Sequence, residues 1–476
     1  MKFLKFTALF FILPNLIFGQ DNILKKCYQN QANFKSKTFE FKYTEKQYSF
    51  RHASYPWQKG EDFLSGIYFL NNGSITTIDS VDGKVRKTFI DGKTFASTKF
   101  GMNELQKLTI SDFYNRKFKA LQFSPLFLLE NLYFKKVKSN SENPTHKIYN
   151  TEINKEKIEV FINKKTNLID KIHKTYYDEF YGDLETTILY QNYKNIDGKY
   201  FATKVNIEKI NGKLVDEVEI SDIKSISKIE NNFSIPTDYK LTEDSETKPE
   251  ILYNKFSDNI HLLELKHTDD KVLIAEFETY LIVAEAPMNS KNGELIISKA
   301  KELFPNKPIK YFAFGHYHPH YIGGIRAFVN NGTKIICSEL NKEYATYLSK
   351  TKHSLIPDKQ ELNKKEIQIE LIKDKLIYSD NKNELQIYFI GEKSAHSNDY
   401  LIYYFPREKV LFQDDLVWIK SDGDIEKASK RQAGLYKAII DLNLDVKTIL
   451  QSWPVKDYGV KTTIPFSDLE KSMNVK

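Results

Sequence analysis

Cysteine is almost absent from this chain of 476 residues, which contains only Cys27 and Cys337. Two cysteines so far apart exclude a disulfide framework, and we do not expect them to form a single long-range bridge. Cys337 ends an apolar run at residues 333–337, so it is predicted to be a small core residue in a buried strand. The fold is therefore not predicted to depend on covalent cross-links.

A strong charge of one sign is also missing. The formal net charge is +7, from 70 basic and 63 acidic residues. Lysine and glutamate are interleaved along the whole chain, which is typical of a solvated surface. A nucleic-acid-binding protein would be expected to gather its basic residues in a patch or stripe. We therefore predict no nucleic-acid partner.

Long hydrophobic runs are confined to the N-terminus. Lys2 and Lys5 precede a mostly apolar stretch at residues 6–18, and Gly19 offers a small residue near a cleavage point. The stretch is short for a bilayer span of about 20 residues, which makes a transmembrane anchor the weaker alternative. Residues 1–20 are therefore predicted to be a signal peptide. The mature protein is expected to be periplasmic or secreted, without a transmembrane segment.

Residues 21–241 have the pattern of a β-rich domain. Tight hairpin turns are predicted at the Asp-Gly pair 197–198 and the Asn-Gly pair 211–212, because these residues tolerate a positive φ. The segment 204–210 between them alternates polar and apolar residues. Such alternation is expected of an antiparallel sheet with one face in water.

One helix, at residues 111–119 or 125–133, is expected to cover a face of this sheet. The strand pattern and hairpin spacing loosely resemble the curved half-barrel of periplasmic lipoprotein carriers. This resemblance implies that the domain would bind an apolar ligand or an envelope partner. Its three histidines, His52, His146 and His173, are predicted to be isolated surface or strand residues without a catalytic role.

The charged stretch at residues 242–250 is predicted to be a linker. From residue 251 to residue 476 the pattern changes to alternating strands and helices. Strands are predicted at residues 260–263, 271–277, 279–284 and 311–314, and helices at residues 293–304 and 324–329. This organisation predicts a second domain with enough strands for two sheets.

The second domain contains a histidine-rich turn, Gly-His-Tyr-His-Pro-His-Tyr-Ile-Gly-Gly at residues 315–324, directly after a predicted strand. Neutral imidazoles at this density are typical of a zinc site. Because side chains alternate in an extended chain, His316 and His318 are expected to point the same way. A third ligand must come from elsewhere, and His396 is the candidate. Asp415, at the end of a later strand, is a candidate carboxylate ligand.

This order of elements resembles the metallo-β-lactamase fold superfamily, over residues 259–468. The family signature is a strand followed by His-x-His-x-Asp-His-x-Gly-Gly, then a distant histidine, Gly-Asp-Leu after an apolar strand, and a final histidine. The resemblance implies an α+β fold, in which a C-terminal αββα sandwich follows the mainly antiparallel, half-barrel-like domain. It also implies that His316, His318 and His396 form a tri-histidine zinc position open to one solvent molecule.

The second metal position of the family is altered in this chain. His320 stands where the family has aspartate, and Tyr321 stands where it has histidine. Asp415 matches the aspartate that completes the metal pair, although Asp414 replaces the glycine before it. No histidine follows His396, so the family's last ligand is missing. We therefore expect one zinc ion rather than two.

The altered positions have candidate roles in catalysis. His320 is predicted to accept a proton or to add a nitrogen ligand. Tyr321 is predicted to donate a hydrogen bond to an oxyanion, or simply to pack in the turn. Asp415 is predicted to act in catalysis and metal binding, or else to cap a strand or pair with a lysine.

Two functional hypotheses follow from the sequence. The leading one is an exported zinc-dependent hydrolase of reduced or altered activity, acting on an unknown small-molecule substrate, because the fold alone does not fix the substrate. The alternative is a catalytically inactive family member. Such a protein would serve as an envelope ligand-binding or scaffold protein, with its N-terminal domain as the working part.

Overall fold

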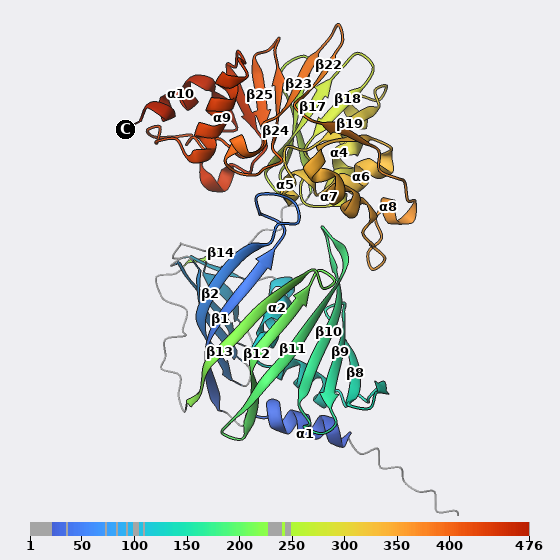
Figure 1. The fold of residues 1–476 in the computed structure, drawn as a ribbon, viewed down its shortest axis with the longest axis vertical. Helices are drawn as coiled ribbons and strands as arrows, with labels where there is room; N and C mark the ends of the chain where they lie inside the picture. The colour runs from blue at the N-terminus through green and yellow to red at the C-terminus, as the bar shows by residue number, and fades with distance from the viewer. Residues whose placement is uncertain are drawn as a thin grey trace, which may run out of the picture.

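A computed structural model describes residues 21–34, 37–71, 74–81, 84–91, 94–98, 104–107, 110–226, 240–242 and 249–475. The predicted signal peptide and most of the predicted linker, residues 243–248, lie outside the described residues. Figure 1 shows two bodies along the longest axis of the molecule, the N-terminal sheet below and the C-terminal half above. Among the described helices, none combines the length and the apolar character that a bilayer span needs.

A single sheet of fourteen strands forms the N-terminal body. Its strands in chain order are β1 (Thr38–Ser49), β2 (Gly60–Asn71), β3 (Ser74–Val81), β4 (Lys84–Asp91), β5 (Thr94–Thr98), β6 (Glu104–Lys107), β7 (Ser141–Glu142), β8 (His146–Ile153), β9 (Glu156–Asn163), β10 (Ile169–Asp178), β11 (Gly182–Ile196), β12 (Lys199–Lys209), β13 (Leu214–Ile226) and β14 (Lys240–Thr242). Strand β1 pairs antiparallel with both β2 and β13, which joins the early strands to the later ones. Only β14 runs parallel to its described neighbour, β6. The predicted antiparallel architecture of this domain is thus confirmed.

Three helices pack in the core of this body: α1 (Asn22–Gln31), α2 (Ile110–Lys119) and α3 (Leu126–Phe134), with a 3₁₀ turn η1 (Ala120–Gln122) before α3. The sequence predicts one helix at either of two segments, and the structure has a helix at each. Helix α3 is apolar around most of its circumference and buries Leu128, Leu129 and Leu132. It can do so because α1, which sequence reasoning missed, packs against it.

Two further sheets form the C-terminal half. The first contains β15 (Ile251–Lys255), β16 (Ile260–Leu265), β17 (Asp270–Glu276), β18 (Leu281–Ala284), β19 (Ile309–Ala313), β20 (Lys334–Ser338) and β21 (Ile369–Ile372), in this spatial order. The second contains β22 (Lys375–Ser379), β23 (Glu384–Phe389), β24 (Leu401–Phe405), β25 (Val410–Gln413), β26 (Thr448–Gln451) and β27 (Thr463–Pro465). Pairing is parallel from β18 to β21 and between β25 and β26, because helical crossovers connect these strands.

Helices lie on the outer faces of both sheets (Figure 1). They are α4 (Ser290–Leu303), α5 (Pro319–Ile322), α6 (Ile325–Asn331), α7 (Glu339–Lys350) and α8 (Lys359–Leu362) beside the first sheet, and α9 (Lys430–Asp441) and α10 (Phe466–Asn474) beside the second, with 3₁₀ turns η2 (Gly391–Ser394) and η3 (Lys456–Tyr458). The buried side chains of Leu273, Leu385 and Tyr403 belong to the core between the sheets. The four layers confirm the predicted αββα sandwich.

The two bodies meet at one end of the N-terminal sheet. The Tyr181 hydroxyl, in the turn between β10 and β11, lies 3.0 Å from the Tyr344 hydroxyl on α7. Next to it, Gly182 has a φ of 81° and comes so close to Lys352 that a Cβ would lie 2.2 Å from its carbonyl oxygen. Only glycine fits this turn, because it alone combines a positive φ with no side chain.

Both cysteines are buried and unpaired, as the sequence predicts. Cys27 lies on α1 and Cys337 on β20, so each is a core residue of a different body. Burial raises the pKa of both thiols, that of Cys337 to about 12. Neither is therefore a reactive thiolate at neutral pH.

Candidate metal centre

His316 and His318 lie in the loop between β19 and α5. Strand β19 ends at Ala313, so the alternation expected of an extended strand does not place these two rings, and that part of the prediction is wrong. The chain bends after the strand, and Pro319 then begins α5, where its fixed φ suits the first helical position. The two rings nevertheless meet, with centroids 4.4 Å apart.

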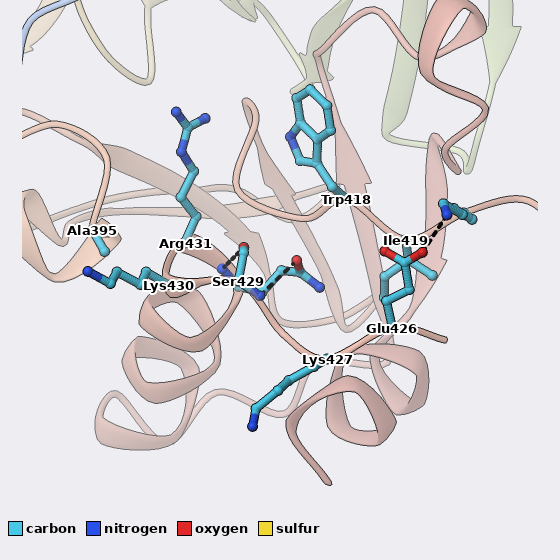
Figure 2. Close-up of a pocket in the computed structure, with 10 residues that line it drawn as sticks. Ala395, Trp418, Ile419, Glu426, Lys427, Ser429, Lys430 and Arg431 are labelled. Carbon is cyan, nitrogen blue, oxygen red and sulfur yellow. Dashed lines mark hydrogen bonds and ion pairs between the residues drawn. The ribbon is translucent and has the colours of Figure 1, made fainter. Parts of the chain in front are cut away.

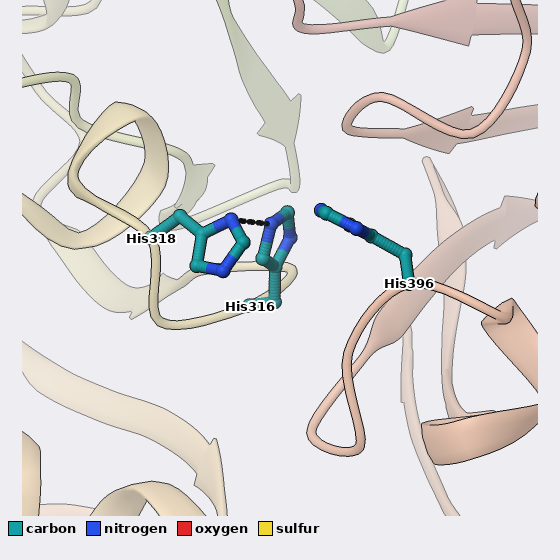
Figure 3. Close-up of side chains that lie close together, drawn as sticks. All are labelled: His316, His318 and His396. Carbon is teal, nitrogen blue, oxygen red and sulfur yellow. Dashed lines mark hydrogen bonds between the residues drawn. The ribbon is translucent and has the colours of Figure 1, made fainter. Parts of the chain in front are cut away.

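His396 approaches from the second sheet, in the turn between η2 and β24. Ala395, just before it, has a left-handed φ of 53° that ends the 3₁₀ turn. Figure 3 shows the three rings, from two separate loops, close to one another. One nitrogen from each of His316, His318 and His396 lies within 4.8 Å of the others. The structure thus brings together the three residues that the sequence proposes as zinc ligands.

The spacing of two of these nitrogens fits a single metal ion. Nitrogen ligands at about 2.0–2.1 Å from a tetrahedral zinc ion lie roughly 3.3 Å from one another. The Nε2 atom of His316 is 3.0 Å from the Nδ1 atom of His318. The Nε2 atom of the third ring, His396, is 3.0 Å from Oδ2 of Asp415. A metal ion held by the three rings would therefore lie beside this carboxylate.

The second nitrogen of two of these rings has an acceptor. The Nδ1 atom of His316 lies 2.7 Å from Oδ2 of Asp414. The Nε2 atom of His318 lies 3.1 Å from the carbonyl oxygen of Ala53. A proton on Nδ1 of His316 and on Nε2 of His318 leaves the lone pair on the other nitrogen of each ring free for a metal ion. Outer partners of this type are what fixes the orientation of metal-binding histidines.

Burial keeps these imidazoles neutral. It lowers the pKa of His316 well below its usual value and the pKa of His318 to about 3, and the neighbouring histidines act in the same direction. The neutral imidazole is the form that binds a metal ion. Neither ring therefore has to release a proton to the solvent before binding metal in neutral solution.

Two buried acids contact the histidine loop and hold it in place. Asp414 and Glu285 are both fully buried, and burial raises the pKa of Asp414 well above its usual value, with the Glu285 charge adding to the effect. Glu285 accepts hydrogen bonds from the Gly315 N–H at 3.0 Å and the Tyr403 hydroxyl at 3.2 Å. A Cβ at Gly315 would lie 2.1 Å from Oδ2 of Asp414, so glycine makes room for the acid. Sequence reasoning saw Asp414 only as a replaced glycine and missed Glu285.

We expect the Asp414→Asn variant to bind zinc about 10- to 100-fold more weakly than the wild type, because it replaces the carboxyl group whose Oδ2 atom lies 2.7 Å from Nδ1 of His316 and holds that ring in place. Competition with a chromophoric chelator measures the change. The matched control is Asp170→Asn, which removes a carboxylate 2.9 Å from the ring of His146, remote from this centre. Equal zinc affinity in the wild type and Asp414→Asn would contradict the supporting role of this acid.

His320 and Tyr321 lie beside the three-histidine cluster and are not part of it. The Nδ1 atom of His320 lies 3.1 Å from Oδ1 of the fully buried Asp270, and its ring is 4.9 Å from the ring of Trp453. The Tyr321 side chain is completely buried, with its ring 4.4 Å from that of His316. Packing accounts for this position of Tyr321, and its hydrogen bond to an oxyanion stays a prediction.

Asp415 lies at the edge of the cluster. Its Oδ2 atom is 3.0 Å from Nε2 of His396 and 3.1 Å from Nη1 of Arg431. Its other oxygen accepts a hydrogen bond from the Tyr400 hydroxyl at 3.2 Å. Burial alone would raise the pKa of Asp415, but His396 and Arg431 outweigh it and lower the pKa. A carboxylate that stays charged beside His396 is within reach of an ion held there.

A cavity of about 580 Å³ lies beside Arg431 and Ala395 (Figure 2). It is lined by Ala395, Trp418, Ile419, Lys420, Glu426, Lys427, Ser429, Lys430, Arg431 and Gln432. Glu426 is paired with Lys420 and Arg431 with Asp415, which leaves Lys427 and Lys430 as an excess of positive charge among the lining residues. Arg431 connects the cavity to the cluster through its ion pair with Asp415.

The N-terminal body also reaches the cluster. The ring of His52 lies 5.0 Å from the ring of His318, so the prediction that His52 is isolated is wrong. His146 on β8 contacts Asp170 on β10, across β9, and His173 on β10 contacts Thr187 on the adjacent β11. Nothing in the local sequence distinguishes His52 from the other two, because its neighbour is 266 positions away along the chain.

The layers and the site together decide the fold. Helices enclose two packed sheets, and loops at the sheet ends carry the three histidines. The C-terminal half has the αββα arrangement that the resemblance to the metallo-β-lactamase fold superfamily implies. The substituted second metal position sets it apart from the signature of this fold superfamily, since His320 and Tyr321 occupy positions where that signature has an aspartate and a histidine.

No family model and no curated protein matches the sequence. Among solved structures, the chain is similar to a metallo-β-lactamase from Pontibacter korlensis, with 16% identity, 47% of this chain and 98% of that chain covered, and a TM-score of 0.35. It is similar to the mono-zinc form of the metallo-β-lactamase FIM-1 from Pseudomonas aeruginosa, with 15% identity, 48% and 96% coverage, and a TM-score of 0.35. At this sequence identity, we assign no role to any residue of this chain from these two structures.

Proposed function

We propose that this protein is an exported zinc-dependent hydrolase that holds one zinc ion at His316, His318 and His396. The supporting observation is the convergence of three ring nitrogens within 4.8 Å, beside an open cavity. Three imidazoles leave one position for solvent or substrate, as in catalytic rather than structural zinc sites. Such an ion lowers the pKa of the water it binds and polarises a carbonyl or phosphoryl oxygen.

Asp415 and Arg431 are proposed to position solvent and substrate beside the zinc ion. The Oδ2 atom of Asp415 lies 3.0 Å from Nε2 of His396 and 3.1 Å from Nη1 of Arg431, and Tyr400 donates a hydrogen bond to Oδ1. Being charged and fixed, the carboxylate is suited to orient a solvent molecule or to complete the metal coordination. Arg431 faces both Asp415 and the cavity, so it is suited to contact a substrate as it enters.

His320 is the candidate proton acceptor. Its Nδ1 atom is hydrogen-bonded to Asp270, and the side chain is 22% exposed, so solvent reaches the ring. A buried carboxylate at one ring nitrogen orients the imidazole and leaves the other nitrogen to face the solvent. Because Asp270 occupies Nδ1 of His320, this nitrogen is not available to a second metal ion. The hydrogen bond therefore supports the proposal of one zinc ion rather than two.

The proposed substrate is a small molecule that carries negative charge near the bond to be cleaved. Lys427, Lys430 and Arg431 line the cavity beside the cluster, and positive charge there raises the local concentration of anions. The resemblance to the superfamily implies cleavage of an ester, thioester, amide or phosphoester. The fold does not select among them.

Export is proposed from the leader-like pattern of residues 1–20 and places the mature protein in the periplasm or outside the cell. An apolar ligand or an envelope partner for the N-terminal domain likewise stays a prediction. The alternative function, a catalytically inactive ligand-binding or scaffold protein, would use the same fold. Zinc content and hydrolysis distinguish the two functions.

Metal analysis of protein purified without chelator tests the proposal. We expect close to one zinc ion per chain, and hydrolysis of at least one member of a panel of anionic ester, thioester and phosphodiester substrates. The His316→Ala variant is the control and should lose both properties. Zinc that is bound without any hydrolysis would favour the inactive alternative. No zinc, even after addition of excess Zn²⁺, would contradict the proposal itself.

A further inference from the structure

The loop between β1 and β2, residues 50–59, extends from the N-terminal sheet to the metal centre, where Figure 1 shows it below α5. Both sides of this loop are anchored. Arg51 forms an ion pair with Asp178 at 2.6 Å, and the ring of Trp57 lies 4.9 Å from the ring of Tyr344 on α7. The tip between these anchors therefore has a defined position against the C-terminal half.

Ala53, at the tip, forms three polar contacts with the histidine loop. Its N–H donates to the Tyr317 hydroxyl at 2.7 Å, and this hydroxyl donates to the Ala53 carbonyl oxygen at 2.8 Å. The same carbonyl oxygen lies 3.1 Å from Nε2 of His318. Ser54 adds a fourth contact, because its carbonyl accepts a hydrogen bond from the Asn398 N–H at 2.6 Å. The loop thus touches both segments that carry the three histidines.

We infer that this loop is a functional part of the metal centre, in which the Ala53 carbonyl positions His318 as a ligand. The inference deepens the proposed function and rests on it. A carbonyl can only accept, so the proton of His318 must be on Nε2 when this hydrogen bond forms. Its Nδ1 atom, which faces Nε2 of His316 at 3.0 Å, then carries the lone pair.

Tyr317 is the positioning residue that holds the carbonyl in place. Its side chain is buried, and its hydroxyl bonds both polar groups of the Ala53 backbone. Without this hydroxyl, the Ala53 carbonyl would lose one of its two hydrogen-bond donors. The loop would also lose its main link to the histidine turn. The two halves of the chain would on this view form one functional unit, with the N-terminal domain completing the outer shell of the zinc site.

The Tyr317→Phe variant of the full chain tests this inference. We expect its zinc affinity to fall about 10-fold, the lower end of the range for outer-shell partners, as measured by chelator competition. The matched control is Tyr344→Phe, at the same interface with its ring 5.5 Å from that of Tyr317, whose hydroxyl contacts Tyr181 and not the loop. This control should keep the wild-type affinity. Circular dichroism confirms that both variants fold.

Limited proteolysis supplies a second readout that does not depend on a variant folding. If the loop orders the zinc site, linkage requires that zinc orders the loop to the same extent. Zinc should therefore slow tryptic cleavage after the exposed Lys59 in the wild type, and slow it much less in Tyr317→Phe.

Three outcomes would overturn the inference, and they differ in what else they affect. Wild-type zinc affinity in Tyr317→Phe, with equal protection of Lys59, would remove the role of the loop and leave the hydrolase proposal intact. Absence of zinc binding in the wild type would remove both. A tenfold loss in both Tyr317→Phe and Tyr344→Phe would show that the interface acts only through general stability, which also contradicts a specific role for Ala53.

Discussion

The His396→Ala variant is expected to lose stoichiometric zinc. His396 is the one proposed ligand that the second half of the αββα sandwich supplies, in the turn before β24, and its ring nitrogen lies with those of His316 and His318 within 4.8 Å. Removal of an outer-shell partner already costs about 10- to 100-fold in metal affinity, so loss of a direct ligand should weaken binding by more than about 100-fold. Hydrolysis should fall to the level of the zinc-free protein.

Metal analysis after dialysis, together with chelator competition, measures this effect. The matched control is His146→Ala, which removes a histidine of the N-terminal sheet that pairs with Asp170 and has no part in the cluster. Retention of one firmly bound zinc ion in His396→Ala would mean that the ion is held elsewhere. The assignment of His316, His318 and His396 to one site would then be wrong.

The ligands of this site could be proposed from sequence because their signals are local. His316 and His318 are two residues apart, and a predicted strand precedes them. His396 is distant, but it falls before an apolar strand, in the order that the superfamily signature requires. The αββα architecture was readable for the same reason, since each strand and helix has its own periodicity.

The surroundings of the ligands could not be predicted, because they depend on contacts between distant segments. Asp414 is 98 positions from its partner His316, and Ala53 is 265 positions from His318. A backbone carbonyl also has no residue type that could mark it in a sequence. His52 looked like the other isolated histidines for this reason, and only the packing of the two bodies distinguishes it.

The Arg326→Leu variant is expected to lower the stability of the C-terminal half by about 3–5 kcal/mol, the usual effect of breaking a buried ion pair. Arg326 lies on α6 with a side chain only 3% exposed, and its Nε atom is 2.7 Å from Oδ2 of Asp358. The guanidinium also donates to the carbonyls of Leu348, Ser349 and Thr351. Leucine fills much of the space but leaves the acid and these carbonyls without their donor.

The pH dependence of stability gives this prediction a second signature. Burial alone would raise the pKa of Asp358, but the Arg326 hydrogen bond and charge outweigh it and lower the pKa to about 2. The unfolded value is about 3.9. The folded state therefore gains stability from this carboxylate above that pH and loses the gain as the pH falls toward the folded pKa.

Urea unfolding at pH 7 and at lower pH tests both effects. In Arg326→Leu, the acid-dependent loss of stability should shrink along with the stability itself, because the group that lowers the Asp358 pKa is gone. The matched control is Lys342→Leu, which breaks an exposed ion pair with Glu339 on α7 and should leave the unfolding midpoint almost unchanged. Equal losses in the two variants would mean that the Arg326 pair contributes no more than a surface contact. In that case the α6 and α8 side of the sandwich would have to be stabilised by its apolar packing alone.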